Sequence, residues 1–67
     1  MLSIYVNGES DIPDNVLDAI NSMQAVFGIR GRYTADLDEM RQFIAENSGQ
    51  EIADQVKADY FLHPQAL

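Results

Sequence analysis

The sequence predicts a small α+β domain in which three helices cover a two-stranded β element, in the order β-α-β-α-α. Three observations predict this class. Apolar and polar residues alternate at the start of the chain, apolar residues recur at helical spacing in three later stretches, and segments containing Gly separate several of these stretches. Because the chain has 67 residues, of which 46% are apolar, we expect residues 1–67 to form one domain with a single core.

The first expected element is a strand at residues 2–7. In an extended chain, Leu2, Ile4 and Val6 lie on one face. Asn7-Gly8 then supplies a turn signal that ends the strand.

A helix is expected over residues 12–25. Asp11 is placed to cap its N-terminus, and the first turn of a helix tolerates Pro13. Apolar residues recur three and four positions apart, which is the spacing of one helical face. They are Val16, Ile20, Met23 and Phe27, with Leu17 beside them.

The segment that follows is ambiguous, because Phe27 can end the helix or begin a strand. We favour a short strand at residues 27–33 that pairs with the first strand, its Arg side chains pointing away from the core. Gly28 and Gly31 would mark a bend or a close backbone approach. Two strands alone are only marginally stable, so helices must cover them.

Residues 36–47 are expected to form the second helix, because Asp36 and Glu39 have the spacing of an N-terminal capping pair. Residues 48–51 match a Ser-x-x-Glu capping box for a third helix, which we expect to end near Leu62, before a His-Pro dipeptide. We expect the last few residues to be frayed. The apolar faces of the two helices comprise Leu37, Met40, Phe43 and Ile44, then Ile52, Val56 and Tyr60.

The charge balance is the main compositional signal. Eleven acidic residues outnumber four basic ones, for a net charge of −7, and residues 1–29 contain four acidic residues and no basic residue. Such a surface repels nucleic acid and attracts basic sites, which favours a basic nucleic-acid-binding protein complex as partner over nucleic acid itself. The alternative is that the charge serves solubility alone.

The residues of catalytic chemistry are scarce. The chain has one His and no Cys, and its Ser residues lack the glycines of a nucleophile elbow, so we predict no enzyme, no catalytic residue and no cofactor. Asp36, Asp38 and Glu39 resemble part of a calcium loop. The required glycine and bidentate acid are replaced by Arg41 and Asn47, so no metal site is predicted.

No stretch approaches the roughly 18 consecutive apolar residues of a membrane span, and no basic region precedes an apolar run at the start. We therefore expect an unprocessed cytoplasmic protein without membrane contact. The absence of Cys fits a reducing compartment.

Acidic residues on the expected helices are the candidate contact residues. Asp11, Asp14 and Asp18 lie three and four positions apart, where like charges cost an isolated helix about 0.2–0.5 kcal/mol. Carboxylates held on helices can imitate the phosphates of a duplex and occupy a site built for nucleic acid. The predicted partner-binding residues are Asp11, Asp14, Asp18, Glu46, Glu51, Asp54 and Asp59.

One stretch resembles a known family. Residues 27–34, Phe-Gly-Ile-Arg-Gly-Arg-Tyr-Thr, are followed by the acidic Asp36-Leu37-Asp38-Glu39 and by Phe43-Ile44. This order is similar to a segment of ArdA-type antirestriction proteins, in which an aromatic-x-Gly-x-Tyr turn leads through a Ser/Thr cap into an acidic helix. Those proteins are phage and mobile-element DNA mimics that block restriction enzymes, and small acidic anti-CRISPR proteins use a similar strategy.

The resemblance implies a small acidic inhibitor of a host nucleic-acid-binding defence complex, CRISPR or restriction, that acts by DNA mimicry in the host cytoplasm. The chain is far shorter than that family and carries Arg30 and Arg32 within the turn, so no family interface is carried over. Two outward-facing arginines that neutralise neighbouring acids are the simpler account of that pair.

The alternative function is a protein-interaction module, such as an antitoxin or a regulatory subunit, that binds through an apolar surface. A hydrophobic interface survives moderate salt, whereas a phosphate mimic is released by it. The sequence leaves open whether the chain is a monomer or a homodimer.

Overall fold

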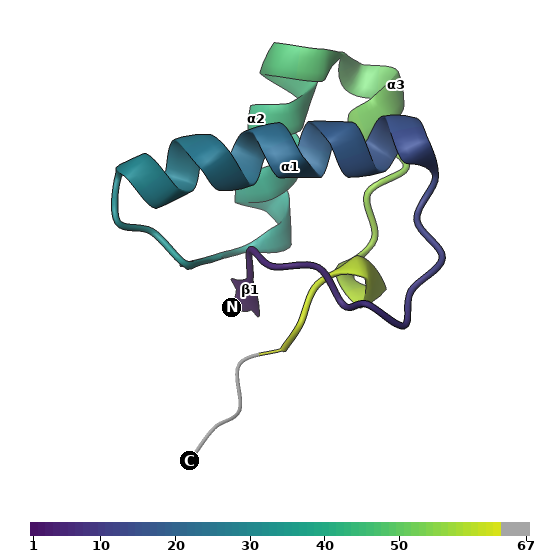
Figure 1. Ribbon diagram of the computed structural model, residues 1–67. Coiled ribbons are helices and arrows are strands. Elements are labelled where there is room, and N and C mark those ends of the chain that lie inside the picture. The colour runs from purple at the N-terminus through teal and green to yellow at the C-terminus, as the bar shows by residue number, and fades with distance from the viewer. Residues whose placement is uncertain (64–67) are drawn as a thin grey trace.

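The computed structural model describes residues 1–63, and the expected fraying of the last few residues lies outside that range. The elements are β1 (Leu2–Ser3), α1 (Asp14–Ile29), β2 (Thr34–Ala35), α2 (Leu37–Ser48) and α3 (Gln50–Ala53), followed by a 3-10 turn at Ala58–Tyr60 (Figure 1). The predicted α+β class and the order β-α-β-α-α are confirmed.

The two strands pair in the antiparallel sense, with Leu2 opposite Ala35 and Ser3 opposite Thr34. The predicted strand pairing is therefore present, although β1 covers only two of the six residues expected. Leu2 and Ala35 are buried, so alternation along each strand turns the side chains of Ser3 and Thr34 to the opposite face.

The N-terminal segment also pairs on its other side with the end of the described chain. The amide of Ser3 donates to the carbonyl of Leu62 (2.8 Å), and the amide of Leu62 donates to the carbonyl of Tyr5 (3.1 Å). Val6 and Phe61 form an isolated antiparallel bridge beyond them. β1 and the residues after it are therefore flanked by backbone on both sides, which the sequence did not predict.

The predicted strand at 27–33 is wrong at the residue level. Phe27 to Ile29 form the last turn of α1, and β2 begins only at Thr34. Phe27 is buried on the same helical face as Met23, so its contribution to the core outweighs the alternation that suggested a strand. Gly31, with φ 72°, forms the turn after the helix.

The third helix is also shorter than predicted: it ends at Ala53 and does not reach Leu62. The guanidinium of Arg41 donates to the carbonyl of Val56 from Nε (2.9 Å) and Nη2 (2.6 Å). That carbonyl would otherwise accept a bond within a continuing helix. The chain instead descends so that Phe61, which is fully buried, reaches the core beside β1.

The side chains predicted as helix caps do not cap. α1 starts at Asp14 with Pro13 in the N-cap position, so Asp11 lies outside the helix. Asp36 does occupy the N-cap position of α2, but its side chain makes no capping bond, and Gly49 precedes α3 in place of the expected serine. These helix starts depend on packing more than on local caps.

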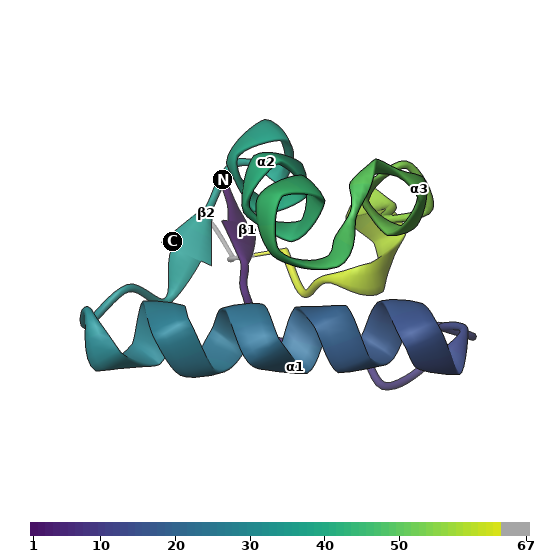
Figure 2. The same ribbon diagram turned by 90° about the horizontal axis from the view of Figure 1, so that it is seen from above.

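The core lies between α1 and the other elements. α1 runs along one side of the molecule, and α2 and α3 pack next to each other on its inner face (Figure 2). The side-chain amide of Gln24 donates to the carbonyl of Ile4 (2.9 Å), which ties α1 to the N-terminal segment. The largest fully buried side chains are those of Phe61, Ile4, Ile20, Met23, Met40, Ile44, Val16 and Val56.

Within the described residues, no helix has both the length and the apolar character needed to cross a membrane.

Candidate functional site

All seven acidic residues predicted to bind a partner are exposed. Within residues 1–63 the one ion pair joins Arg32 to Glu39, so none of the seven takes part in one. The carboxylate of Asp54 accepts a hydrogen bond from the side chain of Gln50 at 2.8 Å. The charge of these seven residues is therefore not neutralised by a basic side chain of the described chain.

Asp14 and Asp18 project from the outer face of α1. At about 100° per residue, both lie roughly opposite Val16 and Ile20, which are fully buried. Asp11 lies in the segment that leads into the helix. Because the free backbone N–H groups of a helix start carry partial positive charge, Asp14 in the first turn is stabilised there more than Asp18.

Asp59 joins this group through the backbone. The hydroxyl of Ser10 donates to the carbonyl of Asp59 at 2.6 Å, so the 3-10 turn lies against the segment that precedes α1. Asp11, Asp14 and Asp18 thus lie at and just before the start of α1, and Asp59 lies on the turn that packs against the segment leading into that helix. We call these four residues the acidic end.

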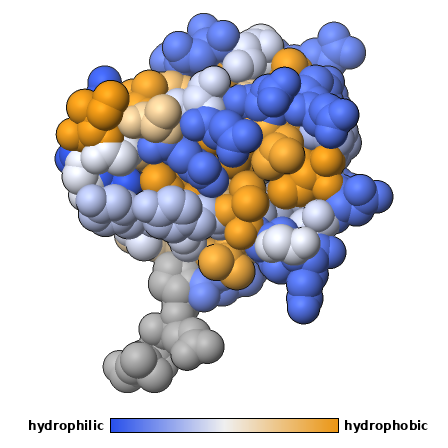
Figure 3. All heavy atoms as spheres, viewed as in Figure 1, coloured by the Kyte–Doolittle hydropathy of each residue, from blue (hydrophilic) through white to orange (hydrophobic). Residues whose placement is uncertain are grey.

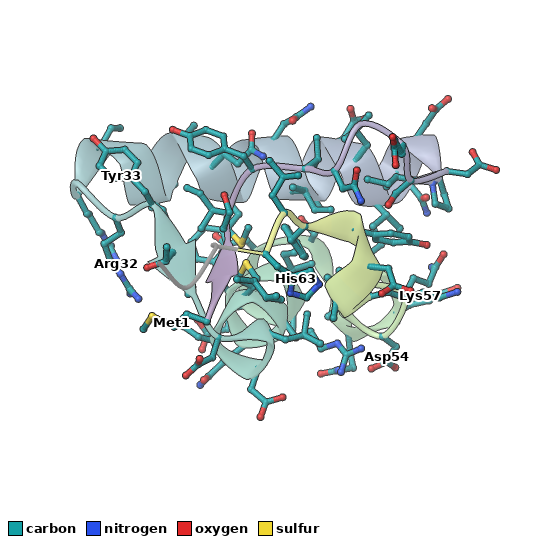
Figure 4. The ribbon with its side chains drawn as sticks, turned by 90° about the horizontal axis from the view of Figure 1, so that it is seen from below. Met1, Arg32, Tyr33, Asp54, Lys57 and His63 are labelled. Carbon is teal, nitrogen blue, oxygen red and sulfur yellow. The ribbon has the colours of Figure 1, made fainter. Side chains whose placement is uncertain are left out.

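Glu51 in α3 and Asp54 directly after it add exposed negative charge near the same end of α1. α3 packs on the inner side of α1, near the end where α1 begins (Figure 2). Asp54 lies on the side turned away from α1, with Lys57 near it (Figure 4). Glu51 and Asp54 are thus exposed on or directly after α3 and are treated as a second group.

Glu46 stands apart from the other six. It lines a hollow of about 160 Å³ together with residues from the last turn of α1 and from α2. The hollow is lined by Phe27, Arg30, Arg32, Glu39, Gln42, Phe43 and Glu46. Arg32 lies at the opposite end of the molecule from Asp54 and Lys57 (Figure 4). The structure therefore does not bring Glu46 into the acidic end.

Arg32 is held in place at this second end. Its Nη2 donates to Oε1 of Glu39 at 2.7 Å, and Nη1 donates to Oε2. Its guanidinium carbon lies 5.1 Å from the centroid of the Phe27 ring, and that ring meets Phe43 edge to face with centroids 5.5 Å apart. The Arg side chains in this segment thus come from a turn and not from a strand, and Arg32 neutralises a neighbouring acid.

This pairing shifts both groups in the directions expected for an ion pair. The hydrogen bond from Arg32 holds the pKa of the Glu39 carboxyl below its ordinary value. The same bond raises the pKa of the Arg32 guanidinium above its ordinary value. Both groups therefore stay charged through the neutral range, and Arg30, which is exposed, makes no ion pair within residues 1–63.

Sequence reasoning missed an exposed surface on the β layer. Val6 and Phe61 face the core, so alternation turns Tyr5 and Leu62 to the other side, where they are 49% and 47% exposed. The sulfur of Met1, which is 74% exposed, lies 3.5 Å from the hydroxyl of Thr34. We call Met1, Ser3, Tyr5, Thr34 and Leu62 the outer β face.

Part of this surface was visible in the sequence. The alternation in residues 2–7 already separates Ser3 and Tyr5 from the core positions. Leu62 was assigned to the end of a helix, so nothing placed it beside Tyr5. Its partner is set by a backbone pairing across most of the chain.

Among residues 1–63, no three His, Cys, Asp or Glu side chains gather as potential metal ligands. Comparison with protein-family models, with curated proteins and with solved structures found no match. The resemblance to antirestriction proteins and the absence of catalysis therefore stay predictions.

Proposed function

We propose that this chain inhibits a nucleic-acid-binding host defence complex, of the restriction or CRISPR kind, by occupying its basic site as a substitute for phosphates. The observation that carries the proposal is the acidic end: Asp11, Asp14 and Asp18 are exposed at and just before the start of α1, Asp59 is exposed on the turn whose backbone is bonded to Ser10, and none of the four forms an ion pair within residues 1–63. Carboxylates without a basic neighbour are available to Lys and Arg side chains of a partner.

The distribution of charge supports one orientation of binding. Figure 3 shows one face of the molecule by hydropathy, with hydrophilic and hydrophobic residues interspersed over it. Arg30 and the turn that carries it lie at the far end of α1 from the acidic end. A basic groove on the partner attracts the acidic end and repels Arg30 at the other end of α1. The chain is therefore expected to approach the groove with its acidic end first.

The structure ranks the seven candidate residues within this proposal. Asp11, Asp14, Asp18 and Asp59 are expected to carry most of the binding, because three of them lie at or just before the start of α1 and the fourth is on the turn bonded to the segment that leads into it. Glu51 and Asp54 are expected to contribute less, since they belong to another element and Asp54 lies on the side turned away from α1, with Lys57 near it (Figure 4). Glu46 is expected to contribute least, because Arg30 and Arg32 share its hollow.

The first experiment is a pull-down from host lysate with the tagged protein at low salt, followed by elution with a salt step and identification by mass spectrometry. We expect a DNA- or RNA-binding complex whose nucleic acid competes with this protein. Recovery of a salt-resistant partner without a nucleic-acid function would contradict the proposal.

A matched pair of variants then tests the acidic end itself. Asp14→Asn with Asp18→Asn should weaken binding of the recovered complex, whereas Asp36→Asn with Asp38→Asn changes the net charge equally at the start of α2. All four residues are exposed, so both variants are expected to fold. Equal losses in the two variants would show that only net charge matters and would reject a defined site.

The second candidate function is an interaction module that binds through an apolar surface. The observation that favours it is the outer β face, which exposes Tyr5 beside Leu62 and, next to Thr34, the side chain of Met1. Aromatic residues and Met are enriched in protein interfaces. Binding that persists or tightens as salt rises would favour this candidate.

A further inference from the structure

The outer β face differs from the rest of the surface in its chemistry. The chain has a net charge of −7, yet none of the five residues of this face has a charged side chain. Three of the five large hydrophobic residues that the described chain exposes belong to it, namely Met1, Tyr5 and Leu62. The other two, Ile29 and Tyr33, flank the turn after α1.

Backbone pairing holds these side chains in one layer. Ser3 lies opposite Thr34 on one flank of β1, while the amides of Ser3 and Leu62 bond to Leu62 and Tyr5 on the other. The inner side of the same layer carries Leu2, Ile4 and Phe61, all buried. A β layer with one face on the core and an apolar second face commonly packs on another sheet, at about 10 Å.

We propose that the outer β face is a self-association surface, on which a second copy of this chain packs around a two-fold axis. The carboxylates of the helices would repel any approach of two copies through those sides. The outer β face brings no charged side chain of its own five residues toward the other copy, so two acidic molecules meet there with less repulsion between carboxylates than through the helices. A two-fold interface uses the same patch on both subunits, so each contact that Tyr5 or Leu62 of one copy makes with the other copy is made twice.

The size of the surface sets the strength of the dimer. A standard stable interface buries about 800 Å² on each partner and uses about 20–30 residues a side. Five residues of a molecule with 4365 Å² of accessible surface supply only part of that area. We therefore expect a reversible dimer with a dissociation constant on the order of 10⁻⁴ M.

The response to salt separates this inference from the proposed function. Added salt screens the repulsion between two copies of net charge −7, so it should favour the dimer. The same salt should release a basic partner from the acidic end. Either behaviour can therefore fail while the other is observed.

Sedimentation equilibrium of the purified chain tests the inference, at protein concentrations from about 10 µM to about 1 mM and at low and high salt. The variants are Tyr5→Ser and Leu62→Ser. Ile29→Ser is the matched control, because Ile29 is 87% exposed and lies outside the face. We expect each face variant to weaken dimerisation at least about tenfold, roughly 1.4 kcal/mol, and the control to leave it unchanged.

Backbone NMR of the unmodified chain provides a measurement that needs no variant. The amide signals of Ser3, Tyr5 and Leu62 should shift with protein concentration, while that of Ile29 should stay constant. A chain that is monomeric at every concentration and salt, a dimer that salt dissociates, or an equal effect of Ile29→Ser would each overturn the inference.

Discussion

The acids near the start of α1 and the Arg32–Glu39 pair beyond its other end differ in whether their charges are paired within the described chain. Around the start of α1, Asp11, Asp14, Asp18 and Asp59 are exposed and form no ion pair in residues 1–63. Beyond its other end, Arg32 binds Glu39 with two hydrogen bonds and lies over the Phe27 ring. A charged group that already forms an ion pair within the chain gains less from binding a partner, because its existing hydrogen bonds would have to be broken first. Exposure and pairing, which composition does not show, therefore separate acids that a partner can bind directly from Glu39, whose charge is already paired.

The largest expected effect comes from removing the Phe27 ring, on which Arg32 packs beyond the end of α1. Phe27 is 3% exposed and packs on both Phe43 and Arg32, so Phe27→Ala should reduce the free energy of unfolding by about 3–5 kcal/mol. Urea denaturation measures it. Ile29→Ala, two residues further along α1 and 87% exposed, should stay within about 0.5 kcal/mol of the unmodified protein.

The next largest effect is the loss of partner binding when two carboxylates of the acidic end are neutralised. Asp14→Asn with Asp18→Asn should weaken binding of the basic complex about tenfold, roughly 1.4 kcal/mol, and reduce its dependence on salt. Stability should change by less than about 1 kcal/mol, because removing a like-charge pair at i and i+4 relieves only a small repulsion. Titration calorimetry at several salt concentrations gives the slope. An unaltered slope would show that these carboxylates are not in the contact.

A smaller effect is expected from substitutions of two glycines at the end of α1 and in the turn that follows it. Gly31 has φ 72°, so Gly31→Ala should destabilise the fold by about 1–2 kcal/mol. Gly28 lies inside α1 with open space around its Cα, so Gly28→Ala should stabilise the protein by about 0.5–1 kcal/mol. Thermal unfolding of the two variants should move in opposite directions. A shift of the same sign in both would contradict the assigned backbone.

The smallest expected effect is the pH dependence of stability that comes from the Arg32–Glu39 ion pair. Since the pKa of Glu39 is lowered in the folded state, its pairing contributes stability above the ordinary carboxyl pKa and loses it as pH falls through the folded value. Arg32 stays charged throughout that range, so it adds no pH dependence of its own there. Glu39→Gln should therefore make the loss of stability on acidification less steep. Arg32→Gln should flatten the same acid limb, and adding it to Glu39→Gln should change little further.

The accuracy of the sequence predictions follows the range of the interactions involved. The buried face of α1 was visible in the spacing of Val16, Ile20, Met23 and Phe27, because helical periodicity is a local property. The predicted strand at 27–33 failed for the same reason, since Phe27 fitted two local patterns and only packing against Phe43 and the core decides between them. The predicted third helix was too long because the chain leaves helical geometry after Ala53, and Arg41, fifteen residues before Val56, binds the Val56 carbonyl in the segment that follows.

What the sequence by itself determined was the α+β class, the order of the elements, and the concentration of unopposed acid in residues 1–29. Only the tertiary structure placed Asp59 beside Ser10, separated Glu46 from the other acids, and set Leu62 next to Tyr5. The physical reason is that periodicity and charge are properties of neighbouring residues. The surfaces that a partner meets are made by contacts between segments far apart in the chain, which depend on how the whole core packs.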